Sequence, residues 1–486
     1  MTVVSALAHE VVPAMAPERF APVLSPGEYE ALLGLVEHAA RELHGRVIWN
    51  VNSTAKGGGV VEMLRPLLGY CRGAGVDARW TVISGQPAFF ATTKRIHNRL
   101  HGFDGDGGPL GDAERDVYEQ TLAASAAELV ELVHPQDIVI LHDPQTAGLA
   151  AAVRETGATV MWRCHVGLDA ANDRSREAWD FLRGYVLNAH VFIFHRAGFA
   201  WEGLPRDRVA VIRPSIDAFA PKNAGQEREQ SLAIMATAGI LAADVDGYPT
   251  FTRSDGTPGR IERRAEMVEE EPLVADVPVV MQVSRWDQLK DPVGVLRAFE
   301  RHVAKRSSAH LLLAGPSTAA VADDPEGAQV LEAVRSAWHE LSAPIRRRVH
   351  VCSLPMDDIE ENAAIVNALQ RHASVVVQKS LAEGFGLTVA EAMWKQRPVV
   401  ASRIGGIRDQ IEHGRSGLLL SDPRDLEEVG AAISGLLADA ERAQTIGLAA
   451  ERRVQQQFLG PHHLGRYFEV IHRVGARRER DGPVPA

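Results

Sequence analysis

Cysteine is scarce in this sequence, and the few cysteines are scattered. Only Cys71, Cys164 and Cys352 occur among 486 residues, and none of them belongs to a CxxC pair. A disulfide framework or a structural zinc site needs paired or clustered cysteines. The sequence therefore predicts neither, and a reducing compartment is expected.

Long apolar runs are missing as well. No segment approaches the roughly 20 consecutive apolar residues that a membrane-spanning helix requires. The stretch Met1–Met15 is mildly apolar but has neither a basic start nor a clear cleavage site, so no signal peptide is predicted. We therefore expect a cytoplasmic protein that uses intracellular substrates and does not bind a membrane.

An excess of positive charge is also absent. The chain has 52 lysines and arginines against 63 aspartates and glutamates, a formal net charge of −11. Such a chain does not attract a phosphate backbone, so nucleic-acid binding is not expected. A phosphate ligand would need a few local basic residues and helix ends. HExxH, GxSxG and a metal-type histidine pair are lacking, which argues against a metal centre and a serine triad.

The length and the pattern of strands predict two α/β domains. A chain of 486 residues is too long for one core and suits two domains of about 200 residues each. Short apolar runs alternate with helical stretches, which predicts doubly wound parallel sheets. The strands expected in the first series are residues 46–51, 78–83, 137–141, 159–164 and 190–194. Those expected in the second are residues 279–283, 310–314, 349–352, 374–378, 398–401 and 417–420.

Turn-rich sequence separates the two series. Turn dipeptides and an acidic run crowd residues 218–276, which we interpret as a linker or insert. The predicted domains are 1–217, which begins with an extended arm over 1–24, and 277–462. The segment 463–486 is predicted to be a helix and tail that pack back toward the first domain. Two doubly wound, Rossmann-like domains would bring both sets of strand carboxyl ends to one cleft, where ligands of such sheets bind.

A glycine-rich turn follows the first strand. The segment Asn52–Gly59 ends in three glycines before a helix, so its backbone can approach an anion at the helix N-terminus. Its spacing is neither GxGxxG nor a P-loop. A plain strand-to-helix turn explains it equally well.

Two basic residues follow the first strand of the second domain. Arg285 and Lys290 lie five positions apart in one short loop and can both point at one anion. The alternative is a pair of solvated surface charges, the usual fate of such residues. Their place directly after a strand favours a functional role.

A second glycine-flanked helix start carries two acids. The segment Glu383–Met393 follows a strand, and its helix is expected to begin near Leu387. Gly384 and Gly386 leave the first N–H groups of that helix open to phosphate or sugar hydroxyls. Glu383 and Glu391 could then accept hydrogen bonds from two parts of a ligand. A helix-capping acid and an ordinary helix glutamate are the alternative.

Two polar clusters end neighbouring strands of the first domain. They are His142–Gln145 and Arg163–His165. A lone histidine is more often structural than catalytic, but polar residues in loops after adjacent strands favour involvement of at least one cluster in function.

These motifs together resemble a known family. Glu383 and Glu391 resemble the E-x7-E motif of retaining glycosyltransferases with the GT-B fold (glycosyltransferase family 4), and Arg285 with Lys290 resembles the diphosphate-binding pair of that family. The segments 51–59, 78–80, 93–98, 141–145, 162–165 and 391–395 narrow the resemblance to the trehalose glycosyltransferring synthase group, which is similar to fungal-type trehalose phosphorylase. The likeness covers roughly residues 25–475, but the stretch 246–271 is longer than in compact members of the group.

The resemblance implies roles for particular residues. It makes Glu383, Arg285, Lys290 and His165 the catalytic set. It assigns donor and nucleotide binding to Gly58, Gly59, Arg285, Lys290, Gly384, Phe385, Gly386, Leu387, Thr388 and Glu391, and it makes Asn52, Asp143, Gln145 and Arg163 weaker candidates on the acceptor side. The N-terminal domain would be the acceptor side and the C-terminal domain would bind the nucleotide sugar.

The implied reaction transfers glucose from a nucleoside-diphosphate glucose to glucose, reversibly and with retention, giving α,α-trehalose. The resemblance implies that no metal or other cofactor is needed. The implied partners are sugars and a sugar nucleotide, and a homodimer is an open possibility.

Two alternative reactions stay open, and two other classes of protein are disfavoured by the residues. A trehalose phosphorylase would use phosphate and glucose 1-phosphate, and Arg285 with Lys290 serves either reaction. A related GT-B transferase would use another acceptor. A sugar-nucleotide-binding module without activity is disfavoured because the acidic, basic and histidine groups are all present. A dinucleotide dehydrogenase is disfavoured because GxGxxG with an acid about 20 residues further on is missing.

Overall fold

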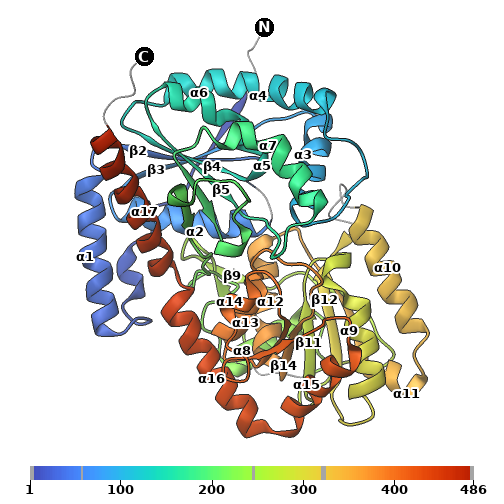
Figure 1. The fold of residues 1–486 in the computed structure, drawn as a ribbon. Helices are drawn as coiled ribbons and strands as arrows, with labels where there is room; N and C mark the ends of the chain where they lie inside the picture. Colours follow the sequence, from blue (N-terminus) through green and yellow to red (C-terminus); the bar gives the residue numbers. More distant parts are fainter. Residues whose placement is uncertain (1–4, 56–57, 244–246, 319–324, 482–486) are drawn as a thin grey trace. The chain divides into compact units, whose positions relative to one another are not determined.

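The chain folds into two α/β units. The computed structural model describes residues 5–55, 58–243, 247–318 and 325–481. One unit consists of Met1–Ser215 with Gly460–Ala486, and the other consists of Ile216–Leu459. Each is built on a seven-stranded sheet with helices on both faces, as Figure 1 shows. None of the helices in the described residues is both long and apolar enough to cross a membrane.

The sheet of the first unit is parallel except at one edge. Its strand order is β1-β3-β2-β4-β5-β6-β7, and only β1 runs antiparallel to its neighbour β3. The bounds are β1 Leu7–Glu10, β2 Val47–Asn52, β3 Asp77–Ile83, β4 Ile138–His142, β5 Thr159–Cys164, β6 Val191–Phe194 and β7 Val209–Val211. The chain adds β3 on one side of β2 and β4 on the other, so the strand order reverses between β2 and β4.

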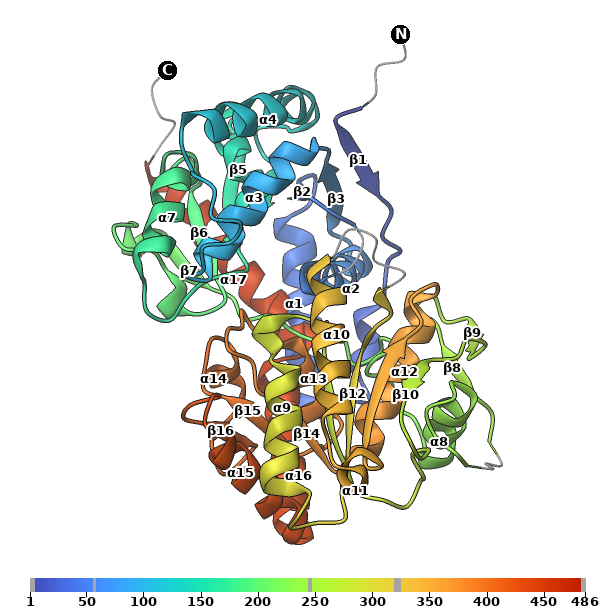
Figure 2. The same cartoon turned by 90° about the vertical axis from the view of Figure 1, so that its right-hand side faces the viewer.

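Helices cover both faces of this sheet. They are α1 Pro26–Glu42, α2 Gly59–Gly73, α3 Pro87–Leu100, α4 Asp112–Leu132, α5 Asp143–Thr146, α6 Ala150–Glu155, α7 Asp173–Val186 and α17 Gly460–Asp481. Side chains alternate along β5, so Trp162 packs in the core with α3, α4 and α7, whereas Met161 packs in the core with α2 and α17. Figure 2 shows α1 beside α17, in agreement with their contacts.

The N-terminal residues are more ordered than an extended arm. Within the stretch 1–24, Leu7–Glu10 forms β1 and Pro17–Phe20 forms a 3-10 turn. The strand pairs along its whole length with β3, whose residues lie 70 to 76 positions further along the chain, so local sequence does not encode this pairing. A capping box begins α1, since the Ser25 N–H donates to the Glu28 carboxylate at 2.9 Å and the Glu28 N–H donates back to the Ser25 hydroxyl at 3.4 Å.

The second unit repeats the same plan. Its strand order is β10-β13-β12-β11-β14-β15-β16, with only β10 antiparallel, and the order reverses between β11 and β14. The strands are β10 Glu266–Val268, β11 Val279–Val283, β12 His310–Pro316, β13 Val349–Leu354, β14 Val375–Gln378, β15 Val399–Ser402 and β16 Leu418–Leu420. The helices are α8 Arg228–Thr237, α9 Pro292–Ala298, α10 Pro325–His339, α11 Ala343–Arg346, α12 Ile359–His372, α13 Leu387–Trp394, α14 Ile407–Gln410, α15 Leu426–Ala438 and α16 Ala440–Gln457. The predicted fold class, two doubly wound α/β domains, is confirmed.

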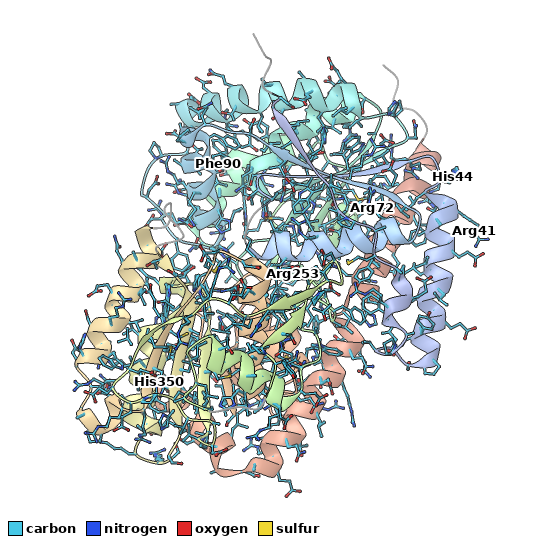
Figure 3. All side chains as sticks on the ribbon, turned by 180° about the vertical axis from the view of Figure 1, so that it is seen from behind. Arg41, His44, Arg72, Phe90, Arg253 and His350 are labelled. Carbon is cyan, nitrogen blue, oxygen red and sulfur yellow. The ribbon has the colours of Figure 1, made fainter. Side chains whose placement is uncertain are left out.

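The stretch 218–276, interpreted from the sequence as a linker or insert, belongs to the second unit. It contains α8, a hairpin of β8 (Thr250–Thr252) with β9 (Pro258–Arg260), and the edge strand β10. Arg253, labelled in Figure 3, donates to the Asp358 carboxylate at 2.6 Å, and the Glu262 N–H donates to Glu361 at 2.7 Å. Helix α8 packs on α12. These strands are three residues long, too short to show an alternating pattern, so only their turns are visible in the sequence.

Candidate active site

Each sheet has one place where the strand order reverses, and several of the predicted site residues end or follow the strands there. Ligands of doubly wound sheets bind outside the carboxyl ends of the strands at such a reversal. In the second unit this is the end of β11, followed by Arg285 and Lys290, and the end of β14, followed by Glu383. In the first unit it is the end of β2, which carries Asn52, and the end of β4, followed by Asp143.

The loop after β11 presents Arg285 outward and Lys290 inward. The Arg285 side chain is 61% exposed and forms an ion pair with Asp287 at 3.0 Å. The second oxygen of Asp287 accepts from the Leu289 N–H at 2.7 Å and caps the short turn Gln288–Lys290. An exposed guanidinium on a capped turn remains available to an anion.

Lys290 reaches across to the loop after β14. Its ammonium forms an ion pair with the Glu383 carboxylate, which also accepts from the Ser380 hydroxyl at 3.3 Å. The Leu381 N–H donates to the Leu289 carbonyl at 2.7 Å, so the two loops are also joined through their backbones. The structure therefore unites a basic and an acidic residue that are 93 positions apart in sequence.

A second, deeper ion pair supports this one. Lys379 is fully buried at the end of β14, and its ammonium binds the Asp291 carboxylate. Asp291 has a left-handed backbone with φ 48° and caps α9 by accepting from the Gly294 N–H at 2.9 Å. A non-glycine residue in this conformation is strained and persists only where its surroundings hold it. Lys379 and Asp291 were not among the predicted residues, and they fix the backbone beside Lys290.

The glycine loop after Glu383 packs against a second glycine pair. Gly386 has φ 84°, brings no side chain to cap α13, and leaves the first N–H groups of that helix for a ligand. At Gly405 a Cβ atom would lie 1.8 Å from the Glu383 carbonyl oxygen. The Gln410 amide donates to the Phe385 carbonyl at 2.5 Å and to the Gly386 carbonyl at 3.2 Å. Gly405 and Gln410 were missed because their role depends on a contact distant in sequence.

Glu391 lies one turn inside α13 and is 3% exposed. Its carboxylate is 3.7 Å from the Lys222 ammonium. Lys395 is also buried and donates to the Gln370 side chain at 2.8 Å, to Asn223 at 3.0 Å and to the Glu391 carbonyl at 3.1 Å. Burial lowers the pKa of Lys395 well below its ordinary value, while the Glu391 carboxylate opposes that shift. Glu391 thus belongs to a buried polar network that sequence reasoning did not reveal.

At the end of β4, Asp143 is held in a strained backbone with φ 64°. The His165 N–H donates to its carboxylate at 2.7 Å, and the Trp162 indole donates to its carbonyl at 3.0 Å. Burial raises the pKa of Asp143 to about 7, against the lowering effects of the His165 N–H and the Arg163 charge. Strain of this kind concentrates at functional sites. The two predicted polar clusters are therefore directly joined.

His165 lies between two other histidines. Its Nε2 is 2.9 Å from Nδ1 of His142, and its Nδ1 is 2.9 Å from Nε2 of His195. His195 was not predicted, although it follows the next strand, β6, in the same position. Burial, aided by the Arg163 charge, places the pKa of each of the three imidazoles well below the ordinary value.

Two predicted acceptor residues have buried side chains that form hydrogen bonds within the protein. Asn52 accepts from the Trp80 indole at 2.9 Å and donates to the Thr54 carbonyl at 2.7 Å. Arg163 is fully buried on the other face of β5, where it donates to His463 at 3.2 Å and to the Tyr467 hydroxyl. Both arrangements indicate structural roles. Gln145 is half-buried beside Asp143 in sequence.

The glycine turn before α2 is partly described. Gly58 has φ 84°, a conformation that favours glycine, and Gly59 is the first residue of α2. Gly57, the first of the three glycines, lies outside the described residues. The turn thus leaves the N-terminus of α2 without a capping side chain.

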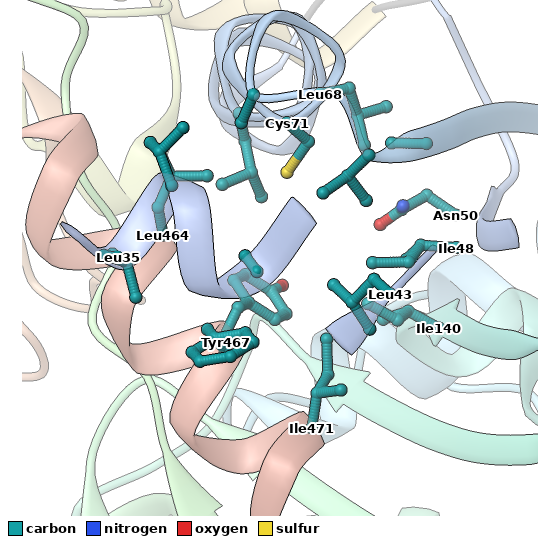
Figure 4. A pocket seen from close by; sticks show the side chains of 17 residues that line it. Leu35, Leu43, Ile48, Asn50, Leu68, Cys71, Ile140, Leu464, Tyr467 and Ile471 are labelled. Atoms are coloured by element: carbon teal, nitrogen blue, oxygen red, sulfur yellow. The ribbon is translucent and has the colours of Figure 1, made fainter. Parts of the chain in front are cut away.

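A separate apolar pocket of about 60 Å³ lies within the first unit, between α1, α2, α17 and the sheet. Figure 4 shows Leu43, Leu68 and Ile471 around it, with the side chains of Asn50 and Tyr467 at its wall. Asn50 also accepts from His142 at 3.0 Å. The lining is apolar, so the pocket does not suit a sugar nucleotide.

Buried histidines make the stability of the protein sensitive to acid. Seven histidines have pKa values below the ordinary 6.5, to about 4 for two of them; they are His142, His165, His190, His195, His310, His372 and His463. Below pH 6.5 the unfolded chain binds protons that the folded chain does not, so stability is lost as the pH falls from 6.5 toward 4. Each histidine contributes about 1.4 kcal/mol per pH unit in this window.

Asp143 opposes this trend, because its raised pKa gives stability that is present below about pH 4 and lost as the pH rises through 7. One carboxyl does not cancel seven histidines. The midpoint of urea unfolding should therefore move to lower urea between pH 7 and pH 5, and equal midpoints at the two pH values would contradict the burial of these groups.

Comparison with known proteins agrees with the geometry. Residues 50–201 match the family model "Trehalose synthase, N-terminal domain", and residues 277–439 match "Glycosyl transferases group 1". The trehalose synthase of Pyrococcus horikoshii is 31% identical over 454 residues, covering 92% of this chain and 96% of the relative. That of Rubrobacter xylanophilus is 32% identical over 445 residues, covering 89% and 92%.

More distant similarities extend the comparison. A trehalose phosphorylase of Pleurotus pulmonarius is 25% identical, covering 96% of this chain and 62% of the relative. The structure of α,α-trehalose 6-phosphate synthase from Burkholderia multivorans aligns with a TM-score of 0.65 at 16% identity, covering 91% of this chain and 99% of that one. The HepE protein of Anabaena, in complex with UDP and glucose, aligns with a TM-score of 0.58 at 16% identity, covering 88% and 100%.

Two doubly wound units with charged loops at their strand reversals define a GT-B glycosyltransferase of group 1. Within that class the chain belongs to the trehalose synthase family. It is a glycosyltransferase of the trehalose synthase type.

Proposed function

We propose that this enzyme transfers glucose from a nucleoside-diphosphate glucose to glucose, reversibly and with retention of configuration, to form α,α-trehalose. The observation that carries the proposal is the Lys290–Glu383 ion pair at the strand reversal of the second unit, beside the exposed Arg285. A cation for a leaving diphosphate and a carboxylate for a sugar hydroxyl lie side by side there. The trehalose synthase relatives provide the product class.

The second unit would bind the donor. Arg285 and Lys290 would stabilise the negative charge that develops on the leaving diphosphate. The open N–H groups of Leu387 and Thr388 after Gly386, with Gly384 and Phe385, would bind phosphate or sugar oxygens, because a helix N-terminus favours negative charge. These groups can supply the positive charge that a metal ion provides in other transferases.

Glu383 and Glu391 would bind different hydroxyls of the donor. Glu383, freed from Lys290 when the diphosphate arrives, would accept a hydrogen bond from the glucose. Glu391, deeper in α13, would accept from the ribose hydroxyls. Lys222 lies 3.7 Å from Glu391 and would help to orient that carboxylate before a ligand binds.

The first unit would supply the groups around the reacting sugar. His165 and Asp143, joined by a backbone hydrogen bond, would meet the sugar hydroxyls or the developing positive charge at the anomeric carbon. Gln145 is a further acceptor-side candidate, and the backbone at Gly58 and Gly59 would approach the diphosphate. Asn52 and Arg163 are proposed to support these residues and not to contact the acceptor.

A donor panel tests this function. UDP-, ADP- and GDP-glucose are each incubated with glucose, and the product is identified by NMR. Formation of α,α-trehalose from at least one donor is expected. If no nucleotide binds in isothermal titration and activity depends on phosphate with glucose 1-phosphate, the enzyme is instead a trehalose phosphorylase, the activity of the Pleurotus relative.

Glu391→Gln is expected to weaken nucleotide binding by about 10-fold or more, since a hydrogen bond to a charged group contributes about 1.5–3 kcal/mol. Glucose binding should change less than 2-fold, because a ribose contact does not involve the acceptor. Titration of the variant with the nucleoside diphosphate and, separately, steady-state KM for glucose check the two effects. Equal weakening of both would contradict a ribose role.

A further inference from the structure

Three imidazoles form an unbroken row at the carboxyl ends of three adjacent strands. His142 ends β4, His165 directly follows β5, and His195 directly follows β6. The rings of His142 and His165 are stacked, with centroids 5.2 Å apart and planes 15° apart. The rings of His165 and His195 meet edge to face at 5.0 Å and 73°. All three are at most 6% exposed.

The hydrogen bonds of the row run in one direction. The Nε2 of His142 is 3.0 Å from the side-chain oxygen of Asn50, which can only accept, so His142 carries its proton on Nε2. Its Nδ1 is then an acceptor and takes the Nε2–H of His165 at 2.9 Å. The Nδ1 of His165 in turn takes the Nε2–H of His195 at 2.9 Å. One proton per ring satisfies every link, and all three rings are the Nε2–H tautomer.

The surroundings keep the row uncharged. Burial is the first cause of the lowered pKa of each ring, and the Arg163 guanidinium is the second. The groups that act on His165 are Arg163, His142, His195 and His463, and all of them lower its pKa. Protonation of His142 or His165 at Nδ1 would also put two donors face to face in one link of the row.

We propose that His142 and His195 are positioning residues that hold His165 in one tautomer and one ring orientation for the transfer reaction. The inference rests on the proposed function of His165. A retaining transfer develops positive charge at the anomeric carbon, so an imidazolium beside it would be repelled, whereas an oriented neutral imidazole is not. The His165 N–H also donates to Asp143, so a fixed His165 keeps that carboxylate in place.

Paired substitutions separate positioning from packing. Asn at position 142 keeps an acceptor close to the place of Nδ1, and Gln at position 195 keeps a donor close to the place of Nε2, whereas Leu removes each group. His142→Leu and His195→Leu are expected to lower kcat by about 10- to 100-fold, which is part of the 10²–10⁴-fold rate enhancement that acid–base groups contribute. The KM for each substrate should stay within about 2-fold. His142→Asn and His195→Gln are expected to restore most of the loss. His44→Leu, on the exposed His44 labelled in Figure 3, is the control.

Nitrogen-15 NMR of histidine-labelled protein tests the row without reference to activity. Three imidazoles should give Nε2–H signals between pH 6 and 8, and His142→Leu should shift the His165 signals toward a mixture of tautomers. If the signals follow this pattern but no donor supports transfer, the row exists and the proposed function is wrong. Normal kcat in both leucine variants, or an equal loss in the leucine and amide variants, would overturn the positioning role.

Discussion

Replacing Lys290 by alanine is expected to lower kcat for glucosyl transfer by about 10²–10³-fold, the usual loss when one preorganised group facing developing charge is removed. Lys290 is held in place by the Glu383 ion pair and by the hydrogen bond that its carbonyl accepts from the Gln282 amide at 2.7 Å. A side chain fixed in this way loses little entropy when the diphosphate arrives. Arg285, which is exposed, is expected to contribute less by itself.

The same substitution also leaves Glu383 without its cation, and a second variant separates the two effects. Lys290→Ala/Glu383→Gln removes the stranded charge as well as the lysine. If the loss arose only from that charge, the double variant would be no slower than Glu383→Gln alone; we expect it to be clearly slower than Glu383→Gln. Lys305→Ala, at an exposed lysine of the same unit, is the matched control and should keep full activity and the same Tm. Near-normal turnover in the double variant Arg285→Ala/Lys290→Ala would contradict the proposal that these two residues bind the diphosphate.

Strands buried on both faces were predicted best, because they are continuous apolar runs. The bounds of β5 and β11 agree with the predicted 159–164 and 279–283, and both strands are buried along their whole length. The edge strands β1 and β10 were missed. Each is short and antiparallel to a distant partner, so its existence depends on tertiary pairing and not on local pattern.

The candidate site was predicted as separate loops, and the structure supplies the connections between them. Sequence spacing placed Lys290 and Glu383 after strands, but the β11–β14 pairing that joins them is a property of the fold. The role of Gly405 was not predicted for the same reason, since only the packed loop shows that a Cβ atom at this position would meet the Glu383 carbonyl oxygen.

The place of Arg163 follows from a pattern that the sequence does contain. The resemblance made Arg163 a weaker acceptor-side candidate and His165 a member of the catalytic set. Side chains alternate along β5, and Arg163 lies on the face that packs against α2 and α17. Because side chains of a strand alternate between its two faces, the sequence alone places Arg163 on the opposite face from Trp162 and Cys164.

Replacing Arg163 by alanine is expected to destabilise the first unit by about 3–5 kcal/mol. The fully buried side chain lies 5.0 Å from the centre of the Tyr467 ring and donates to the Ile212 carbonyl at 3.4 Å and to His463 at 3.2 Å. Its loss leaves buried acceptors without this donor and a cavity beneath α17. The Tm of this unit should fall by roughly 6–20 °C, since 1 kcal/mol corresponds to about 2–4 °C at this size.

The charge of Arg163 provides a second readout that a cavity alone would not change. Its positive charge is one cause of the lowered pKa of His142, His165, His195 and His463. Without it the folded pKa values rise toward the unfolded value, so the loss of stability between pH 6.5 and 4 becomes shallower. Arg163→Met, which fills most of the volume, should lose less stability than alanine but show the same shallower slope. An alanine variant within 1 kcal/mol of the parent protein, or an unchanged slope in both variants, would contradict a structural role for this arginine beneath α17.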